Sequence, residues 1–200
     1  AFINICESVP NIVQEASKTL LCSSVQLVNV TAPHDTLRPE NWMYVYDEDK
    51  YSVRINCTEK LSPANAPSGH TGVQVEVYHS KNKPINESSK VIEDRVIEEL
   101  IEMGLVCPDK AGGREKIKSM SRFVKWANVV FHYDTKLAMD EILNWLESKG
   151  LTRESDDLHP ITDWTMKQDL QNENLVLAGR FGQWKYFWTD DCVLRGSKLA

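Results

Sequence analysis

The residues best suited to bind a ligand lie close together near the end of the 200-residue chain. A short apolar run, Leu175 to Ala178, predicts a buried strand, and Gly179 and Gly182 allow a tight backbone path after it. Arg180 lies between these glycines, two residues beyond the end of the predicted strand. A guanidinium there is costly to leave unpaired, so it is usually matched to an anion. The spacing therefore indicates an anion-binding position.

An aromatic segment and a predicted helix follow this turn. The aromatic residues are Trp184, Tyr186 and Trp188, and the acidic sequence Thr189-Asp190-Asp191 predicts the start of a helix. The first amides of a helix have no intrahelical partner, and the helix dipole favours negative charge at that end. Amides beside large rings suit a flat, partly anionic ligand such as a flavin ring.

Each of these residues also has a purely structural interpretation, which the sequence leaves open. The segment could be an ordinary strand, turn and terminal helix with a few core aromatics. Arg180 could form a salt bridge with an acid such as Asp163 or Asp169. Tyr186 could be a packed aromatic with a satisfied hydroxyl, and Asp190 could serve as a helix cap, which is compatible with ligand binding.

Composition excludes several classes of function. The net charge of −6 and the pI near 5.4 leave no basic patch for a nucleic acid, and the apolar runs are too short to span a bilayer. No histidine or cysteine pair has the spacing of a metal site, so we expect no metal. The five cysteines are scattered, and we expect reduced thiols in a cytoplasmic protein. They are Cys6, Cys22, Cys57, Cys107 and Cys192.

The periodicity of the chain predicts an α+β fold, with a largely antiparallel mixed sheet and helices packed on it. The clearest strand is Thr71 to Tyr78, where Val73, Val75 and Val77 alternate with polar residues. We expect these valines to face an amphipathic helix, Ser89 to Met103. The other expected helices are Asn11 to Leu20, with Ile12, Val13, Ala16 and Leu20 on one face, and Thr135 to Lys149. The other expected strands are Ser23 to Val30, Trp42 to Tyr46, Tyr51 to Asn56, and Ile117 to Val130.

Composition and periodicity together predict three segments. Residues 1–150 form an α+β domain, residues 151–174 form a polar loop, and residues 175–200 form a C-terminal strand and helix. The family resemblance given below implies that the domain of residues 1–150 is of the substrate-binding type. Residues 61–70 are rich in proline, serine and other turn-forming residues and are predicted to form a turn. Residues 109–115 are predicted to form a loop.

The sequence resembles the C-terminal part of the superfamily that includes FAD-dependent amine oxidases, protoporphyrinogen oxidase and UDP-galactopyranose mutase. In that superfamily a strand ending in Gly-Arg-x-Gly leads through aromatics to an Asp at the start of a helix, as residues 175–190 do here. The turn Ser62-Pro63-Ala64-Asn65-Ala66-Pro67-Ser68-Gly69 and the segment Val129 to Asp134 also match its motifs in order. The resemblance spans almost the whole chain, from Val9 to Gly196.

This resemblance implies roles for individual residues. Flavin contacts fall on Gly179, Arg180, Gly182, Thr189 and Asp190, and substrate contacts fall on Trp184 and Tyr186. The superfamily's Gly-x-Gly-x-x-Gly strand–helix unit, which holds the FAD pyrophosphate, is not found in these 200 residues. The resemblance therefore implies a larger parent whose N-terminal FAD-binding domain is missing here. We expect this chain alone to bind FAD weakly or not at all and to be inactive.

Three functions follow from the resemblance. The first is the C-terminal part of an FAD-dependent oxidoreductase of the amine-oxidase or protoporphyrinogen-oxidase type, which supplies the pocket for a small-molecule substrate and the helix that caps the flavin. The second is a UDP-galactopyranose-mutase-like enzyme of surface-polysaccharide synthesis. The third is a non-catalytic binding module of the same fold. No catalytic residue can be identified from the sequence.

Overall fold

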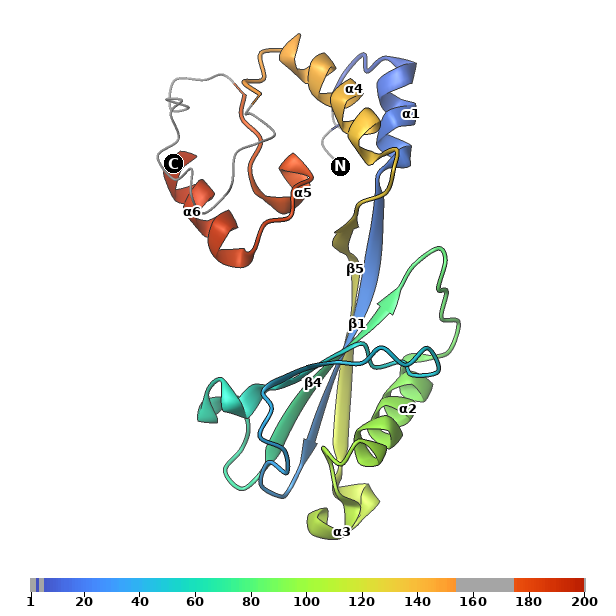
Figure 1. Ribbon diagram of the computed structural model, residues 1–200, viewed down its shortest axis with the longest axis vertical. Coiled ribbons are helices and arrows are strands. Elements are labelled where there is room, and N and C mark those ends of the chain that lie inside the picture. The colour runs from blue at the N-terminus through green and yellow to red at the C-terminus, as the bar shows by residue number, and fades with distance from the viewer. Residues whose placement is uncertain (1–2, 4–5, 154–174, 200) are drawn as a thin grey trace. The chain divides into compact units, whose positions relative to one another are not determined.

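The structure is a computed structural model that describes residue 3 and residues 6–153 and 175–199. Its residues group into two compact units (Figure 1). One unit, here called the helical unit, comprises Ala1–Leu21 and Val129–Ala200. The other, here called the sheet unit, comprises Cys22–Asn128. The predicted segment 1–150 contains residues of both units, and the predicted boundaries at 150 and 174 stay a prediction.

The sheet unit is built on five antiparallel strands in the order β2-β3-β4-β1-β5. Their bounds are β1 (Leu21–Ala32), β2 (Trp42–Tyr44), β3 (Arg54–Cys57), β4 (Thr71–His79) and β5 (Lys118–Val130). All five strands were expected from the sequence, and β2 pairs with β3 as the expected hairpin. The α+β fold class is therefore confirmed.

One face of this sheet packs on helix α2 (Ser89–Glu102) and forms the core. In the register Val75 lies opposite both Val28 of β1 and Ile55 of β3, and all three side chains are fully buried. The predicted alternation of β4 is confirmed, because its valines at 73, 75 and 77 join the helix residues in one apolar cluster. The helix members of that cluster are Ile92, Val96, Ile97 and Leu100. Figure 1 shows α2 lying along this sheet.

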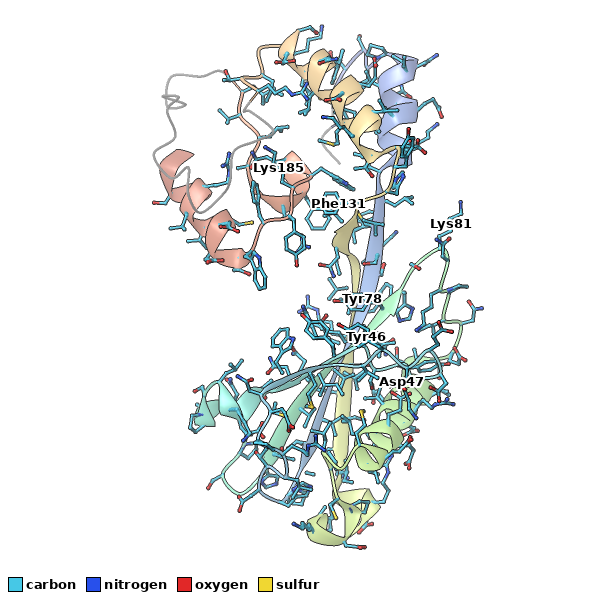
Figure 2. The ribbon with its side chains drawn as sticks, viewed as in Figure 1. Tyr46, Asp47, Tyr78, Lys81, Phe131 and Lys185 are labelled. Carbon is cyan, nitrogen blue, oxygen red and sulfur yellow. The ribbon has the colours of Figure 1, made fainter. Side chains whose placement is uncertain are left out.

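The opposite face carries polar and aromatic side chains, because residues on a strand alternate between the two faces. The Arg54 guanidinium lies over the Trp42 ring, 4.7 Å from its centroid, and also pairs with the Glu76 carboxylate. The Tyr78 hydroxyl donates to the same carboxylate. Burial is the main cause that raises the pKa of Tyr78 to about 12. Tyr46, just beyond β2, is 87% exposed (Figure 2).

Two carboxylates, the buried Glu99 and the half-buried Glu59, hold the loops of the sheet unit in place. Glu99 on α2 accepts hydrogen bonds from the backbone amides of Tyr51 and Ser52, at 2.8 and 2.9 Å, and from the Ser52 hydroxyl at 2.6 Å. Glu59 similarly accepts from the Thr71 hydroxyl at 2.9 Å and the Gly72 amide at 3.1 Å. Three donors around a buried carboxylate offset the loss of its hydration.

The loops hold short helices that periodicity did not reveal. The expected turn at residues 61–70 contains the 3₁₀ helix Pro63–Asn65, which follows another at Thr58–Lys60. The expected loop at residues 109–115 was wrong, because α3 (Pro108–Ala111) and the 3₁₀ helix Arg114–Lys116 occupy it. Single helical turns are too short to display a repeating apolar face, so their sequences read as loops.

The helical unit packs α1 (Asn11–Thr19) against α4 (Thr135–Glu147). Val13, Ile142 and Leu146 are buried between them, together with Leu151. Both helices were expected, but the placement of Ile12 on the buried face was wrong, since Ile12 is 62% exposed. Helix α1 is only nine residues long and packs through a narrow stripe centred on Val13.

The C-terminal part of this unit differs from the expectation at one point. The run Leu175 to Ala178 is not a strand: it makes a single parallel bridge between Leu151 and Leu175, and Ala178 is exposed. A run of four apolar residues is too short to distinguish a strand from an extended connection. Helix α5 (Gly179–Gln183) then occupies the expected tight turn, and α6 (Thr189–Leu199) is the expected terminal helix.

Candidate functional site

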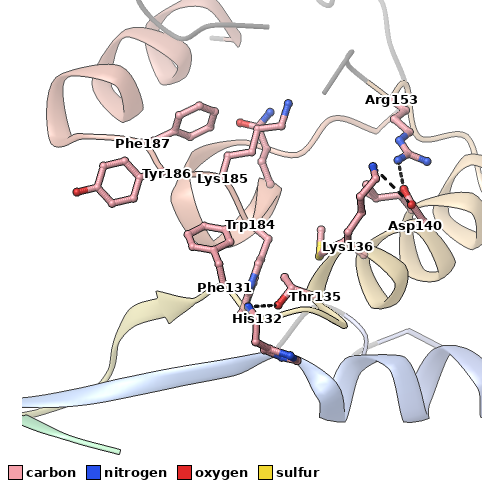
Figure 3. A pocket seen from close by; sticks show the side chains of 13 residues that line it. Phe131, His132, Thr135, Lys136, Asp140, Arg153, Trp184, Lys185, Tyr186 and Phe187 are labelled. Carbon is pink, nitrogen blue, oxygen red and sulfur yellow. Dashed lines mark hydrogen bonds and ion pairs between the residues drawn. The ribbon is translucent and has the colours of Figure 1, made fainter. Parts of the chain in front are cut away.

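A pocket of about 550 Å³ lies within the helical unit, between α4 and the segment that joins α5 to α6 (Figure 3). Its lining combines aromatic rings with charged side chains, and most of it comes from two short stretches of chain. The lining residues are Phe131, His132, Thr135, Lys136, Met139, Asp140, Leu143, Arg153, Gln183, Trp184, Lys185, Tyr186 and Phe187.

The aromatic wall comes mainly from the α5–α6 connection. Trp184 ends α5 with a left-handed backbone (φ 50°), which redirects the chain, and Phe181 packs edge-on against its ring at 6.2 Å. Phe187 is buried, whereas Tyr186 is 63% exposed. Phe131, just after β5, adds a half-exposed ring. These rings offer flat apolar surfaces on which a planar ligand can stack.

The charged wall comes from one face of α4 and from Arg153. Asp140 pairs with the Arg153 guanidinium and lies 3.7 Å from the Lys136 ammonium. The hydrogen bond from Arg153, reinforced by the Lys136 charge, lowers the pKa of Asp140 below its usual value. The second arm of Arg153 donates to the Asn144 side chain at 3.2 Å. Asp140 is therefore ionised at neutral pH, and Arg153 is held at two points along the helix.

The described lining residues carry more positive than negative charge. Lys136, Arg153 and Lys185 are cations, while Asp140 is the single carboxylate among the described lining residues. Figure 3 shows Lys185 on the aromatic side of the pocket, away from the Asp140 group. Cations on two walls of a partly enclosed space favour an anionic ligand.

Hydrogen bonds hold His132 and Thr135, which line the pocket at the start of α4. The His132 ring Nε2 lies 2.9 Å from the Thr19 carbonyl oxygen, so Nε2 carries the proton and donates. The His132 amide donates to the Thr135 hydroxyl at 3.0 Å. His132 is thus a positioning residue that ties the start of α4 to the end of α1.

Two buried donors next to the aromatic wall have no hydrogen-bond partner among the residues that the structure describes. They are Nε of Arg180 and Nε1 of Trp184. The Arg180 guanidinium lies over the Tyr186 ring, 4.8 Å from its centroid. Buried donors are nearly always satisfied, so the acceptors of these two lie outside the described residues, in a bound ligand or in the rest of the chain. The two donors fit the carbonyl groups and partial negative charge of a flavin ring.

The N-terminus of α6 is capped by Asp191, the second of the two acids that the sequence places at the start of this helix. The carboxylate of Asp191, which is 3% exposed, accepts from the Trp188 amide at 2.8 Å. An acid at this third helical position that reaches back to the capping residue is one half of a capping box. Thr189 and Asp190, the predicted flavin contacts, are exposed at the start of the helix. Their assignment stays a prediction.

The structure brings only some of the predicted site residues together. Trp184 and Tyr186, predicted to contact substrate, both line the pocket. Gly179, Arg180 and Gly182 lie in α5 beside it and do not line it. Of the two glycines, only Gly179 is required by its backbone, because its φ is 80°. A Cβ on Gly182 would make only ordinary contacts, the nearest at 3.9 Å. Asp163 and Asp169, the alternative partners of Arg180, lie outside the described residues.

Sequence reasoning missed the charged wall entirely. Lys136 and Asp140 are four residues apart on α4, the spacing of an ordinary solvated ion pair, so nothing in the sequence marks them as pocket residues. Arg153 reaches Asp140 and the pocket only because the folded chain brings it beside α4. Among the described residues, we find no group of three possible metal ligands and no helix long and apolar enough to cross a bilayer.

Comparison with known proteins gives a likeness to a solved structure. No family model matches the sequence, and no curated protein matches it. Among solved structures, the chain is similar to reduced UDP-galactopyranose mutase, with a TM-score of 0.64 and 16% sequence identity. The match covers 86% of this chain and 31% of the mutase chain. The chain thus spans about a third of the length of that protein. At this identity the likeness shows a shared fold, and the resemblance to the superfamily stays a prediction.

Proposed function

We propose that the chain is the substrate-binding and flavin-capping part of an FAD-dependent enzyme that acts on a nucleotide sugar, as UDP-galactopyranose mutase does. The observation that carries the proposal is the pocket, in which aromatic rings and Lys185 face Lys136 and Arg153, on a fold similar to part of that mutase. A nucleotide sugar contains a flat base and a diphosphate. The aromatic rings of the pocket can stack on the base, and its cations can bind the diphosphate.

The charged wall suits a diphosphate for a geometric reason. Arginine presents a planar fork of donors that matches two oxygens at once, and lysine adds a mobile point charge. Arg153 is held along α4, while Lys136 and Lys185 approach from different elements. The aromatic wall, with Trp184 and Tyr186, would stack on the base or on the sugar face.

The proposal includes a flavin held on the same side of the helical unit. Arg180 Nε, Trp184 Nε1 and the first amides of α6 are the groups that would hold it. When bound, a flavin supplies the reactive ring, and the protein supplies position and electrostatics. These residues would stabilise negative charge on the ring and exclude water from it. The pyrophosphate of FAD would be held by a partner domain with a glycine-rich strand–helix unit.

One observation favours the amine-oxidase type of enzyme as a second candidate. A carboxylate among aromatic rings is the chemistry that binds an ammonium group, and Asp140 provides such a carboxylate. However, Asp140 already pairs with Arg153, and Lys136 and Lys185 would repel a cationic substrate. We therefore place the nucleotide-sugar enzyme first. A cytoplasmic location is part of the proposal, since Cys22, Cys57, Cys107 and Cys192 carry free thiols.

Ligand titration distinguishes these possibilities. We propose isothermal titration of the 200-residue chain with UDP-galactose, UDP, uridine and phenethylamine. The nucleotide-sugar proposal predicts binding of UDP-galactose and UDP, much weaker binding of uridine, and none of the amine. Binding of the amine alone would support the amine-oxidase type. Binding of none of them would remove the support that the pocket gives to either enzyme.

Two variants show whether the pocket is the site of binding. Tyr186→Ala removes an exposed ring of the aromatic wall. We expect it to weaken the binding of UDP about tenfold, which corresponds to a loss of roughly 1.4 kcal/mol of stacking free energy. Tyr46→Ala is the matched control, because Tyr46 is an exposed ring in the sheet unit. Equal effects of the two changes would place the nucleotide elsewhere.

A further inference from the structure

The carboxylate of Asp140 occupies the place that an anionic ligand would need. It lies between the Lys136 ammonium and the Arg153 guanidinium, and all three side chains line the pocket. Asp140 and Arg153 are about two-thirds to three-quarters shielded from solvent, with side chains 34% and 22% exposed. Ion pairs that are partly withdrawn from water are screened less by salt than fully exposed pairs.

We propose that Asp140 is an internal counter-ion that competes with the ligand for Lys136 and Arg153, and so limits the pocket to strongly charged anions such as a diphosphate. This inference rests on the proposed function, which supplies the anionic ligand. An incoming phosphate group replaces the carboxylate at the two cations and is repelled by it at the same time. A weakly charged anion gains too little from the cations to overcome both effects.

The arrangement allows the cations to change partner without losing their positions. Arg153 is also anchored by Asn144 at 3.2 Å, so its guanidinium stays along α4 when Asp140 is displaced. Lys136 is four residues before Asp140 on the same helix, and its side chain is 73% exposed. Lys185 lies on the other wall and adds a further positive charge to the pocket (Figure 3).

A counter-ion differs from a ligand-binding residue in the sign of its effect. Removal of a group that holds the ligand weakens binding, whereas removal of a competing negative charge strengthens it. Asp140→Asn is the informative change, because the amide keeps the size of the side chain and an oxygen that accepts from Arg153. Glu147→Gln is the matched control: it removes one negative charge from the exposed end of the same helix, outside the pocket lining.

The experiment is isothermal titration of the 200-residue chain and its variants with inorganic pyrophosphate and, separately, with UDP. We expect Asp140→Asn to bind pyrophosphate about fivefold tighter than the wild type, as for removal of one like charge at a partly exposed site. Asp140→Glu, which retains the charge, should resemble the wild type, and Glu147→Gln should change the affinity less than twofold. If Asp140→Asn does not fold by circular dichroism, Asp140→Ser removes the same charge with a smaller side chain.

The outcomes separate this inference from the proposed function. Tighter pyrophosphate binding with no preference for UDP would support the counter-ion and count against a nucleotide site. Unchanged affinity in Asp140→Asn, or no pyrophosphate binding by any variant, would overturn the counter-ion. Weaker binding in Asp140→Asn would also overturn it, because Asp140 would then hold Arg153 in place for the ligand.

Discussion

The guanidinium of Arg180 lies over the ring of Tyr186, 4.8 Å from the ring centroid, although the two residues belong to α5 and to the connection after it. This contact joins a residue predicted to bind the flavin to one predicted to bind the substrate. The cation holds the exposed tyrosine ring in place at the edge of the pocket, while its own Nε points to no acceptor among the described residues.

Replacement of Arg180 by lysine tests its predicted role in cofactor binding. Arg180→Lys keeps the charge but loses the planar fork, so a bidentate contact would be broken. In the FAD-loaded parent protein we expect turnover or FAD retention to fall by about tenfold or more, equivalent to about 1.4 kcal/mol. Flavin absorbance after desalting measures the retention. Full activity with a lower melting temperature would instead make Arg180 a structural residue.

The cap of α6 gives a prediction about stability. Asp191→Ala removes the carboxylate that accepts from the Trp188 amide, and we expect it to lower the free energy of unfolding by about 1 kcal/mol. Asp190→Ala is the control, because Asp190 is exposed at the preceding position and should cost less. Urea denaturation followed by circular dichroism measures both. Equal losses would mean that the helix dipole, and not the cap, accounts for the effect.

Glu99 provides a similar test in the sheet unit. Glu99→Ala leaves the amides of Tyr51 and Ser52 without their acceptor in a buried place, so we expect a loss of about 3 kcal/mol. Glu98→Ala changes the neighbouring, exposed carboxylate and should alter stability by less than about 0.5 kcal/mol. Thermal melting compares the two variants with the wild type. A mild effect of Glu99→Ala would show that water replaces the carboxylate.

The reactivity of Cys57 follows from its burial. Burial is the main cause that raises the pKa of its thiol to about 11, so about one molecule in a thousand carries the thiolate at pH 8. We expect Cys57 to react with iodoacetamide more slowly than Cys192 in the folded chain, and at a similar rate in urea. Mass spectrometry of peptides after timed alkylation measures this. Fast labelling of Cys57 in the folded chain would show that β3 opens readily.

The sequence was sufficient for the elements with a strong period. The valines of β4 alternate strictly, and α2 repeats its apolar residues at helical spacing, so the sheet face that carries the core could be predicted. The short elements could not. Residues 175–178 are an apolar run without a partner strand, and α5 is a single turn of helix that begins at a glycine. In both places tertiary contacts decide a structure that local pattern leaves open.

The site was predictable only where its residues are neighbours in sequence. Trp184 and Tyr186 lie on one connection, so their appearance in the same pocket follows from local chain geometry. Lys136 and Arg153 come to that pocket from α4 and from the chain after it, and no spacing in the sequence relates them to the aromatics. Periodicity in a single sequence cannot show that residues from separate elements line the same pocket.

A crystal structure of the chain grown with UDP tests the central claim most directly. We predict the diphosphate bound at Lys136, Arg153 and Lys185, with the Asp140 carboxylate displaced from Arg153 and the base against the aromatic wall. Electron density for UDP at another place on the chain, with the pair between Asp140 and Arg153 intact, would contradict the account.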